Sequence, residues 1–158
     1  MAFRKMGRSS VLVVLALVLA VHTMTAHSLD EAMKKECLKI SRRTLKVMLK
    51  AFNACNDKLK LHHVSGEEYQ KKIGCVVRCV MDTVKVLDDK GMITEESLKS
   101  SIEANIPAEF VGPAHEILMK CVKEQKLDPA DENCKSYLDM GTCMQGAVAE
   151  ACGELPMM

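Results

Sequence analysis

The chain has 158 residues, with 22 basic and 21 acidic side chains and a formal net charge of +1. A charge this balanced gives no electrostatic reason to expect a nucleic-acid partner or binding to an anionic membrane surface. The most informative feature of the composition is its eight cysteines.

The N-terminal residues are typical of a secretory signal peptide. A basic segment precedes an uncharged apolar run over residues 11–21, which is shorter than the roughly 20 residues that span a membrane. We therefore predict a signal peptide over 1–28, cleaved somewhere within 20–28, and a secreted single domain over 29–158 without stable membrane insertion. Removing the leader would change the net charge to −2. The alternative is that the leader stays attached as an anchor.

The rest of the chain has the periodicity of helices. Apolar residues recur at steps of three and four, and no alternating run bounded by turn residues indicates a strand. The first helix is expected as one long helix or as two joined by a kink. We predict five to seven helices with short connections, over about 29–59, 65–89, 94–106, 114–126 and 131–152.

Local signals define the expected helix ends. Ser65 and Thr94 are suited to N-cap positions. The second helix is expected to be interrupted near Gly74 and to stop at residues 88–91, where Gly91 is suited to the left-handed position after a helix end. Pro113 is suited to the first turn of the fourth helix.

The even number of cysteines, none of them in the predicted leader, predicts four disulfides in an oxidising compartment. Cys75 and Cys79 stand four residues apart on a predicted helix, which places their Cβ atoms about 6 Å apart. A disulfide needs a separation of about 3.8 Å, so these two cysteines should bond to different elements. The spacing alone leaves the remaining connectivity open.

The cysteine pattern also argues against several classes of protein. It has no C-x2-C or H-x3-H pair of the kind found in zinc sites, so we expect no metal. It lacks the His beside a Cys pair of secreted helical phospholipases, and the adjacent cysteines of plant lipid-transfer proteins. We find no nucleophile–base pair and no phosphate loop, and we therefore expect no enzyme activity and no cofactor.

Six of the cysteines resemble the signature of insect odorant-binding proteins, the pheromone-binding/general-odorant-binding superfamily. The order is Cys55, Cys75-x3-Cys79, Cys121 and Cys134-x8-Cys143. The segment Cys75-Val-Val-Arg-Cys79-Val-Met-Asp, the turn Leu87-Asp-Asp-Lys-Gly91 and the segment Asp131-Glu-Asn-Cys134 are also similar to that family. The resemblance covers roughly residues 45–145.

The resemblance implies a fold and a pairing. The fold would be an all-α, compact, disulfide-stapled bundle around an apolar cavity. The family pairing, carried onto this chain, joins Cys55 to Cys79, Cys75 to Cys134 and Cys121 to Cys143. The two extra cysteines, Cys37 and Cys152, would then bond to each other by elimination. Alternatively, Cys37 is the first cysteine of the family pattern and Cys55 is an extra one.

The resemblance further implies a secreted carrier that binds small hydrophobic ligands, of the odorant or pheromone kind, and transports them through aqueous fluid. Such a carrier would be a monomer or weak homodimer that acts on a membrane receptor only indirectly. The candidate cavity walls are apolar residues near the cysteines, each of which could also be ordinary core. They are Met48, Phe52, Val80, Val84, Ile102, Phe110, Leu118, Val122, Tyr137 and Met140.

Three further features bear on ligand binding. The hydroxyl of Tyr137 could orient a polar end of the ligand. The apolar tail over 155–158 could close the cavity as a lid. Ligand release could follow the titration of His62, His63 or His115.

Two other functions stay open at this stage. One is a secreted binder of amines or eicosanoids with the same fold, which would favour acidic groups inside the cavity. The other is a helical signalling or interaction protein with a collapsed core and no ligand cavity.

Overall fold

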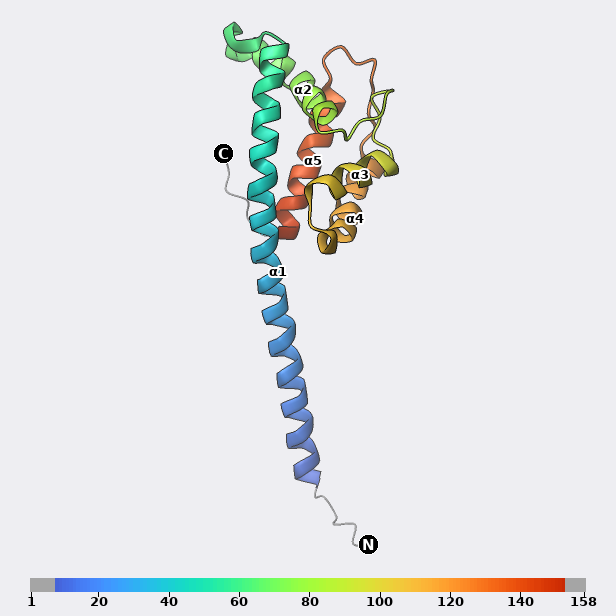
Figure 1. Ribbon diagram of the computed structural model, residues 1–158. Coiled ribbons are helices and arrows are strands. Elements are labelled where there is room, and N and C mark those ends of the chain that lie inside the picture. Colours follow the sequence, from blue (N-terminus) through green and yellow to red (C-terminus); the bar gives the residue numbers. More distant parts are fainter. Residues whose placement is uncertain (1–7, 153–158) are drawn as a thin grey trace. The chain divides into compact units, whose positions relative to one another are not determined.

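A computed structural model describes residues 8–152, with side chains for residue 31 and from residue 33 onward. The described residues form helices without any strand, as predicted (Figure 1). The predicted lid over 155–158 and the first seven residues of the predicted leader lie outside this range. The helices are α1 (Arg8–Lys58), the short 3-10 helix η1 (Leu61–His63), α2 (Gly66–Thr83), α3 (Glu95–Asn105), α4 (Ala108–Glu124) and α5 (Lys135–Cys152).

The chain divides into two units, residues 1–37 and residues 38–158. The second unit contains residues 38–58 of α1 and all the other helices. Within it α2 packs on α5, α4 packs on α5, and α3 packs on α4. No described helix is both long enough and apolar enough to cross a bilayer.

The helix expected over 29–59 is one continuous helix over residues 29–58, the last part of α1. In the second unit its inner face is apolar, with Ala51 and Cys55 buried, while Lys46 and Lys50 are exposed. The helix is followed by Lys60, whose φ of 56° is left-handed, and the chain turns into η1.

The second helix ends six residues earlier than the sequence predicted, at Thr83 instead of Asp89. Lys85 takes a left-handed φ of 61°, and the N–H of Val86 donates to the carbonyl of Met81 at 2.9 Å. Residues of α3 hold this ending in place, because Ser101 donates its hydroxyl to the carbonyl of Val84 at 2.9 Å. The prediction was wrong because these bonds come from a distant part of the chain.

Gly74 does not interrupt α2, contrary to the prediction. It is buried where the backbone at Asn133 and Cys134 passes over the helix. A Cβ at this position would lie 2.4 Å from the carbonyl oxygen of Cys134. The glycine therefore allows a close backbone approach rather than a break.

The predicted start of α3 is confirmed. Thr94 is the N-cap and forms a capping box with Ser97: each side chain accepts a hydrogen bond from the backbone N–H of the other residue. Ser65 is the N-cap of α2, as predicted, but its side chain makes no capping hydrogen bond.

The predicted start of α4 at Ala114 was wrong, because the helix begins at Ala108 after the N-cap Pro107. Pro113 lies inside the helix. The prediction chose Pro113 as the start signal, whereas the helix begins directly after Pro107, six residues earlier.

The last helix begins at Lys135 rather than near Asp131. Asp131 instead precedes it and accepts hydrogen bonds from the backbone N–H groups of Asn133 and Lys135, at 2.9 and 2.7 Å. Cys134, between them, has a left-handed φ of 53°. These hydrogen bonds from exposed backbone hold the pKa of Asp131 below its ordinary value, with the bond from Asn133 the largest cause.

Three disulfides join the elements of the second unit as the resemblance implied. They are Cys55–Cys79, Cys75–Cys134 and Cys121–Cys143. The first links α1 to α2, the second α2 to the start of α5, and the third α4 to α5. Cys75 and Cys79 therefore bond to different elements, as their spacing predicted. Cys37 and Cys152 are also disulfide-bonded.

Candidate ligand-binding site

The apolar interior of the second unit consists of two clusters. The main cluster contains residues of α2, α3, α4 and α5 and of the segments that connect them. Its largest fully buried members are Leu98, Tyr137 and Met140. The α1–α2 cluster has Ala51, Cys55, Leu61, Val76 and Val80 as its buried members. Apart from Gly74, the fully buried residues in the described chain are all hydrophobic.

Val84 connects the two clusters. It is half-buried and packs against both. It occupies the C-cap position of α2, immediately before the left-handed turn at Lys85. The early end of α2 therefore places an apolar side chain where the two halves of the interior meet.

Eight of the ten predicted wall residues lie in these clusters or against them. Phe52 and Val80 belong to the α1–α2 cluster, and Val84 to both. The others belong to the main cluster: Ile102, Leu118, Val122, Tyr137 and Met140.

The structure does not bring Met48 and Phe110 into either cluster. The side chain of Met48 is 38% exposed on α1. Phe110 is half-buried in the first turn of α4. Sequence periodicity places a residue on a helix face, but it does not say how far the neighbouring helices extend along that face.

Tyr137 is fully buried, and its hydroxyl donates a hydrogen bond to the carbonyl of Gly91 at 2.8 Å. The guanidinium of Arg78 lies 5.0 Å from the centre of its ring and donates to the carbonyl of Pro129 at 3.1 Å. Burial raises the pKa of the Tyr137 hydroxyl above its ordinary value. The hydroxyl proton is thus already used to hold the turn at Gly91, where φ is 77°.

Sequence reasoning missed several buried members of the interior. Val86 and Ile93 lie in the connection between α2 and α3, and Leu98 lies on α3. Val86 fell within a predicted helix that ends before it, so its direction could not be inferred. Leu98 is four residues before Ile102 on the same helix face, and that spacing was an available signal.

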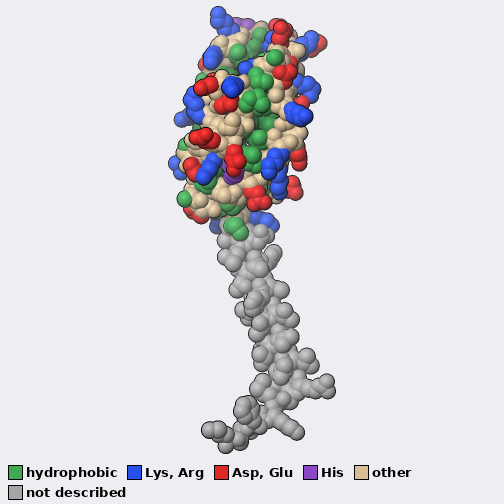
Figure 2. Space-filling model, turned by 90° about the vertical axis from the view of Figure 1, so that its right-hand side faces the viewer, with side chains coloured by type: hydrophobic (Ala, Val, Ile, Leu, Met, Phe, Trp, Pro, Cys, Tyr) green, Lys and Arg blue, Asp and Glu red, His purple; other side chains and the backbone are tan. Residues whose placement is uncertain are grey.

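The half-buried apolar residues form a shell around the main cluster. On α4, Leu118 and Val122 are one turn apart and both are half-buried. Apolar side chains also run in a band down the middle of the face shown in Figure 2, between charged side chains on either side. The main cluster is therefore bordered by apolar side chains that remain partly exposed.

A separate open hollow of about 390 Å³ lies between α2 and the start of α5. None of the ten predicted wall residues contributes to it. Its two lysines are each held in an ion pair one helical turn away, Lys71 with Glu67 and Lys135 with Asp139. Its lining consists of Gln70, Lys71, Gly74, Asn133, Lys135 and Leu138.

The three histidines of the predicted pH response lie in different surroundings. His62 is exposed and contacts Asp57, and His63 is exposed. His115 lies on α4, and its buried Nε2 has no hydrogen-bond partner within the described chain. No group of three or more metal-ligating side chains occurs among residues with described side chains.

Comparison with protein families shows to which family this chain belongs. The sequence model of the PBP/GOBP family matches residues 27–147. This chain belongs to the PBP/GOBP family. No curated protein matches the chain. As a PBP/GOBP protein with eight cysteines and four disulfides, it has one disulfide more than the six-cysteine signature provides.

Proposed function

We propose that this PBP/GOBP protein carries small, uncharged hydrophobic ligands in the apolar interior bordered by the main cluster, and transports them through extracellular fluid. The observation that carries the proposal is the shell of half-buried apolar side chains around that cluster. These side chains leave apolar surface beside the main cluster that protein atoms do not fully cover. A ligand that covered it would be stabilised by the hydrophobic effect.

The chemistry of the interior supports an apolar ligand. The side chains available at the proposed site are aliphatic, thioether and disulfide groups, with the Tyr137 hydroxyl engaged by Gly91. Burying about 300 Å² of apolar ligand surface at about 25 cal/mol/Å² would contribute roughly 7 kcal/mol. After the costs of association, affinity in the micromolar range is expected.

We infer that α4 supplies one wall of the site. Leu118 and Val122 present a half-buried aliphatic surface, and Cys121, between them, is bonded to Cys143 of α5. A cross-link next to the wall would limit its collapse into the space that the ligand occupies. Each such bond also contributes about 2–4 kcal/mol to the stability of the fold.

The test is displacement of a fluorescent apolar probe, measured on the purified protein and on two tryptophan variants. Leu118→Trp should fill the space beside α4 and weaken probe binding at least tenfold. Met92→Trp is the matched control, because Met92 is 37% exposed in the turn between α2 and α3. It should leave the affinity within twofold.

Three outcomes would contradict the proposal. Absence of probe binding to the folded wild-type protein would favour the helical signalling or interaction protein. Displacement by amines or eicosanoids but not by neutral apolar compounds would favour the alternative binder. Equal affinity of Leu118→Trp and wild type would place the site elsewhere, and the open hollow at Gly74 would be the next place to examine.

A further inference from the structure

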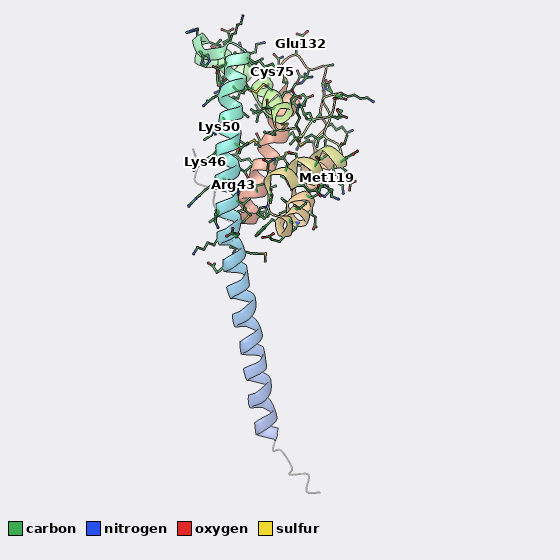
Figure 3. All side chains as sticks on the ribbon, in the orientation of Figure 1. Arg43, Lys46, Lys50, Cys75, Met119 and Glu132 are labelled. Atoms are coloured by element: carbon green, nitrogen blue, oxygen red, sulfur yellow. A yellow bond between two sulfur atoms is a disulfide. The ribbon has the colours of Figure 1, made fainter. Side chains whose placement is uncertain are left out.

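The outer face of α1 carries a row of basic side chains. Arg42, Arg43, Lys46 and Lys50 follow one another along the helix, and three of them are labelled in Figure 3. Their spacing of three and four residues, with Lys39 one turn earlier, places them on one side of the helix. From Lys39 to Lys50 the row is about 17 Å long. We call these five residues the basic row.

The basic row is open to solvent and faces away from the packed interior. All five side chains are exposed, whereas Ala51 and Cys55, on the other side of the same helix, are buried. Arg42, Arg43, Lys46 and Lys50 form no ion pair with any acidic side chain in the described part of the protein. Four neighbouring cations are therefore held close together without local neutralisation.

The charge of the second unit is strongly polarised. Residues 38–58 contain six basic and one acidic residue, a net charge of +5. Residues 59–152 contain 11 basic and 16 acidic residues, a net charge of −5. The near-zero net charge of the chain thus averages two opposite regions, and the sequence expectation that no anionic surface is bound rested on that average.

Exposed aliphatic side chains border the basic row on both sides. Val47 and Leu49 are 43% and 39% exposed, and their positions in the helix place them on opposite flanks of Lys46 and Lys50. When the basic row faces a bilayer, its long side chains reach the phosphate groups, and Val47 and Leu49 lie beside the row at the level of the headgroups.

We propose that α1 docks this protein on an anionic lipid surface through the basic row, with Val47 and Leu49 beside the headgroups. The acidic region of residues 59–152 is repelled by the same surface, so the protein binds in one orientation. Binding is peripheral and reversible, and it does not depend on the proposed ligand site. A flat layer of phosphate groups can contact every cation of the row at once while it repels the acidic region, which favours a bilayer over a flexible soluble polyanion.

The experiment is cosedimentation with vesicles of phosphatidylcholine alone and of phosphatidylcholine with 30% phosphatidylserine. The protein is expressed with its own N-terminus and used as the cell processes it, so that all variants share the same start. Wild type should bind the phosphatidylserine vesicles, should bind phosphatidylcholine at least tenfold more weakly, and should be released in 0.5 M salt.

Two charge-reversal variants separate the basic row from net charge. R43E/K46E/K50E should bind phosphatidylserine vesicles about a hundredfold more weakly than wild type. K72E/K120E/K123E changes the net charge equally at three exposed lysines of α2 and α4, and should stay within threefold of wild type. V47S/L49S should stay within threefold of wild type, because aliphatic side chains beside the headgroups contribute little to binding. Circular dichroism establishes that each variant is folded.

The proposal fails if the two charge-reversal variants bind alike, since net charge alone would then explain binding. It also fails if wild type does not bind phosphatidylserine vesicles but binds heparin, and R43E/K46E/K50E loses the heparin binding. That result would assign the basic row to a soluble polyanion. Self-association at low salt that R43E/K46E/K50E abolishes, without vesicle binding, would also contradict the proposal. It would show that the basic row binds the acidic region of a second copy.

Discussion

At the scale of single residues, Gly74 shows why a glycine on a helix cannot be read from sequence alone. The sequence indicates only a weak point in α2, but the structure uses the missing side chain to let the backbone of residues 133–134 pass close to the helix. The same backbone leads through the Cys75–Cys134 bond into α5. Gly74 therefore determines how closely α2 and the start of α5 pack.

Replacing Gly74 by alanine should destabilise the fold by about 1–3 kcal/mol, because the new Cβ would overlap backbone that cannot move freely. Gly146→Ala is the control. It lies inside α5, and an added Cβ there would meet nothing within 4 Å. That substitution should stabilise the protein by about 0.5–1 kcal/mol through helix propensity. Chemical denaturation measures both, and a Gly74→Ala variant as stable as Gly146→Ala would contradict the close approach.

Asp131 predicts a dependence of stability on pH. Its pKa in the folded protein lies below 3.8, so the charged form is stabilised by folding. This contribution is fully present above the unfolded-state pKa, about 3.9, and is lost as the pH falls through the lower folded-state value. Asp131→Asn should lower Tm at pH 7, and the difference from wild type should shrink below about pH 4. Thermal unfolding across this range would disprove the prediction if the difference were constant.

At the scale of elements, the starts of α2 and α3 have similar sequences but different local hydrogen bonds. Thr94 makes a full capping box with Ser97, while Ser65 occupies the same position in α2 without a side-chain bond. Thr94→Ala should therefore cost about 1 kcal/mol, and Ser65→Ala should cost much less. Urea unfolding of the two variants measures both losses of stability. Equal losses would show that the capping box at Thr94 contributes nothing specific.

The sequence predicted both ends of α3 closely. Thr94 caps its start, and Pro107 follows its last turn, so both act on the backbone next to them. The starts of α4 and α5 also depend on nearby residues, but there the sequence offered two nearby start positions each and the prediction chose the wrong one. The end of α2 at Thr83 was out of reach, because the left-handed Lys85 is supported by a hydroxyl bond from Ser101 to Val84. A non-glycine residue in that conformation gives no signal in the sequence.

At the candidate site, too, the sequence predicted what depends on local spacing and missed what depends on distant residues. Helical periodicity selected residues such as Ile102, Tyr137 and Met140 correctly as interior positions. It could not show that the Tyr137 hydroxyl is engaged by Gly91, because that bond connects two positions 46 residues apart. It also could not find Val86 or Ile93, which are buried by a connection and not by a helix face.

At the scale of the whole molecule, the cysteines carried the most information. Their spacing and family resemblance gave three of the bonds that the structure shows, and these bonds connect α1, α2, α4 and α5. The pairing of Cys37 with Cys152 stays a prediction. A peptide map under non-reducing conditions should contain a fragment that joins them.

Two of the bonds should separate stability from ligand binding. Cys75–Cys134 closes a sequence separation of 59 residues and Cys121–Cys143 one of 22. In the chain-entropy model the larger loop makes the first bond more stabilising by about 1 kcal/mol. The second bond, however, lies between Leu118 and Val122 on the proposed wall.

We therefore expect C75A/C134A to lose more stability in denaturant, and C121A/C143A to lose more affinity for the apolar probe under conditions where both variants are folded. Opposite rankings of the two variants in the two measurements would show that the α4 cross-link shapes the site, beyond its contribution to the fold. If affinity simply followed stability in both variants, the wall formed by α4 would have no role of its own, and the disulfides would act only by keeping the bundle folded.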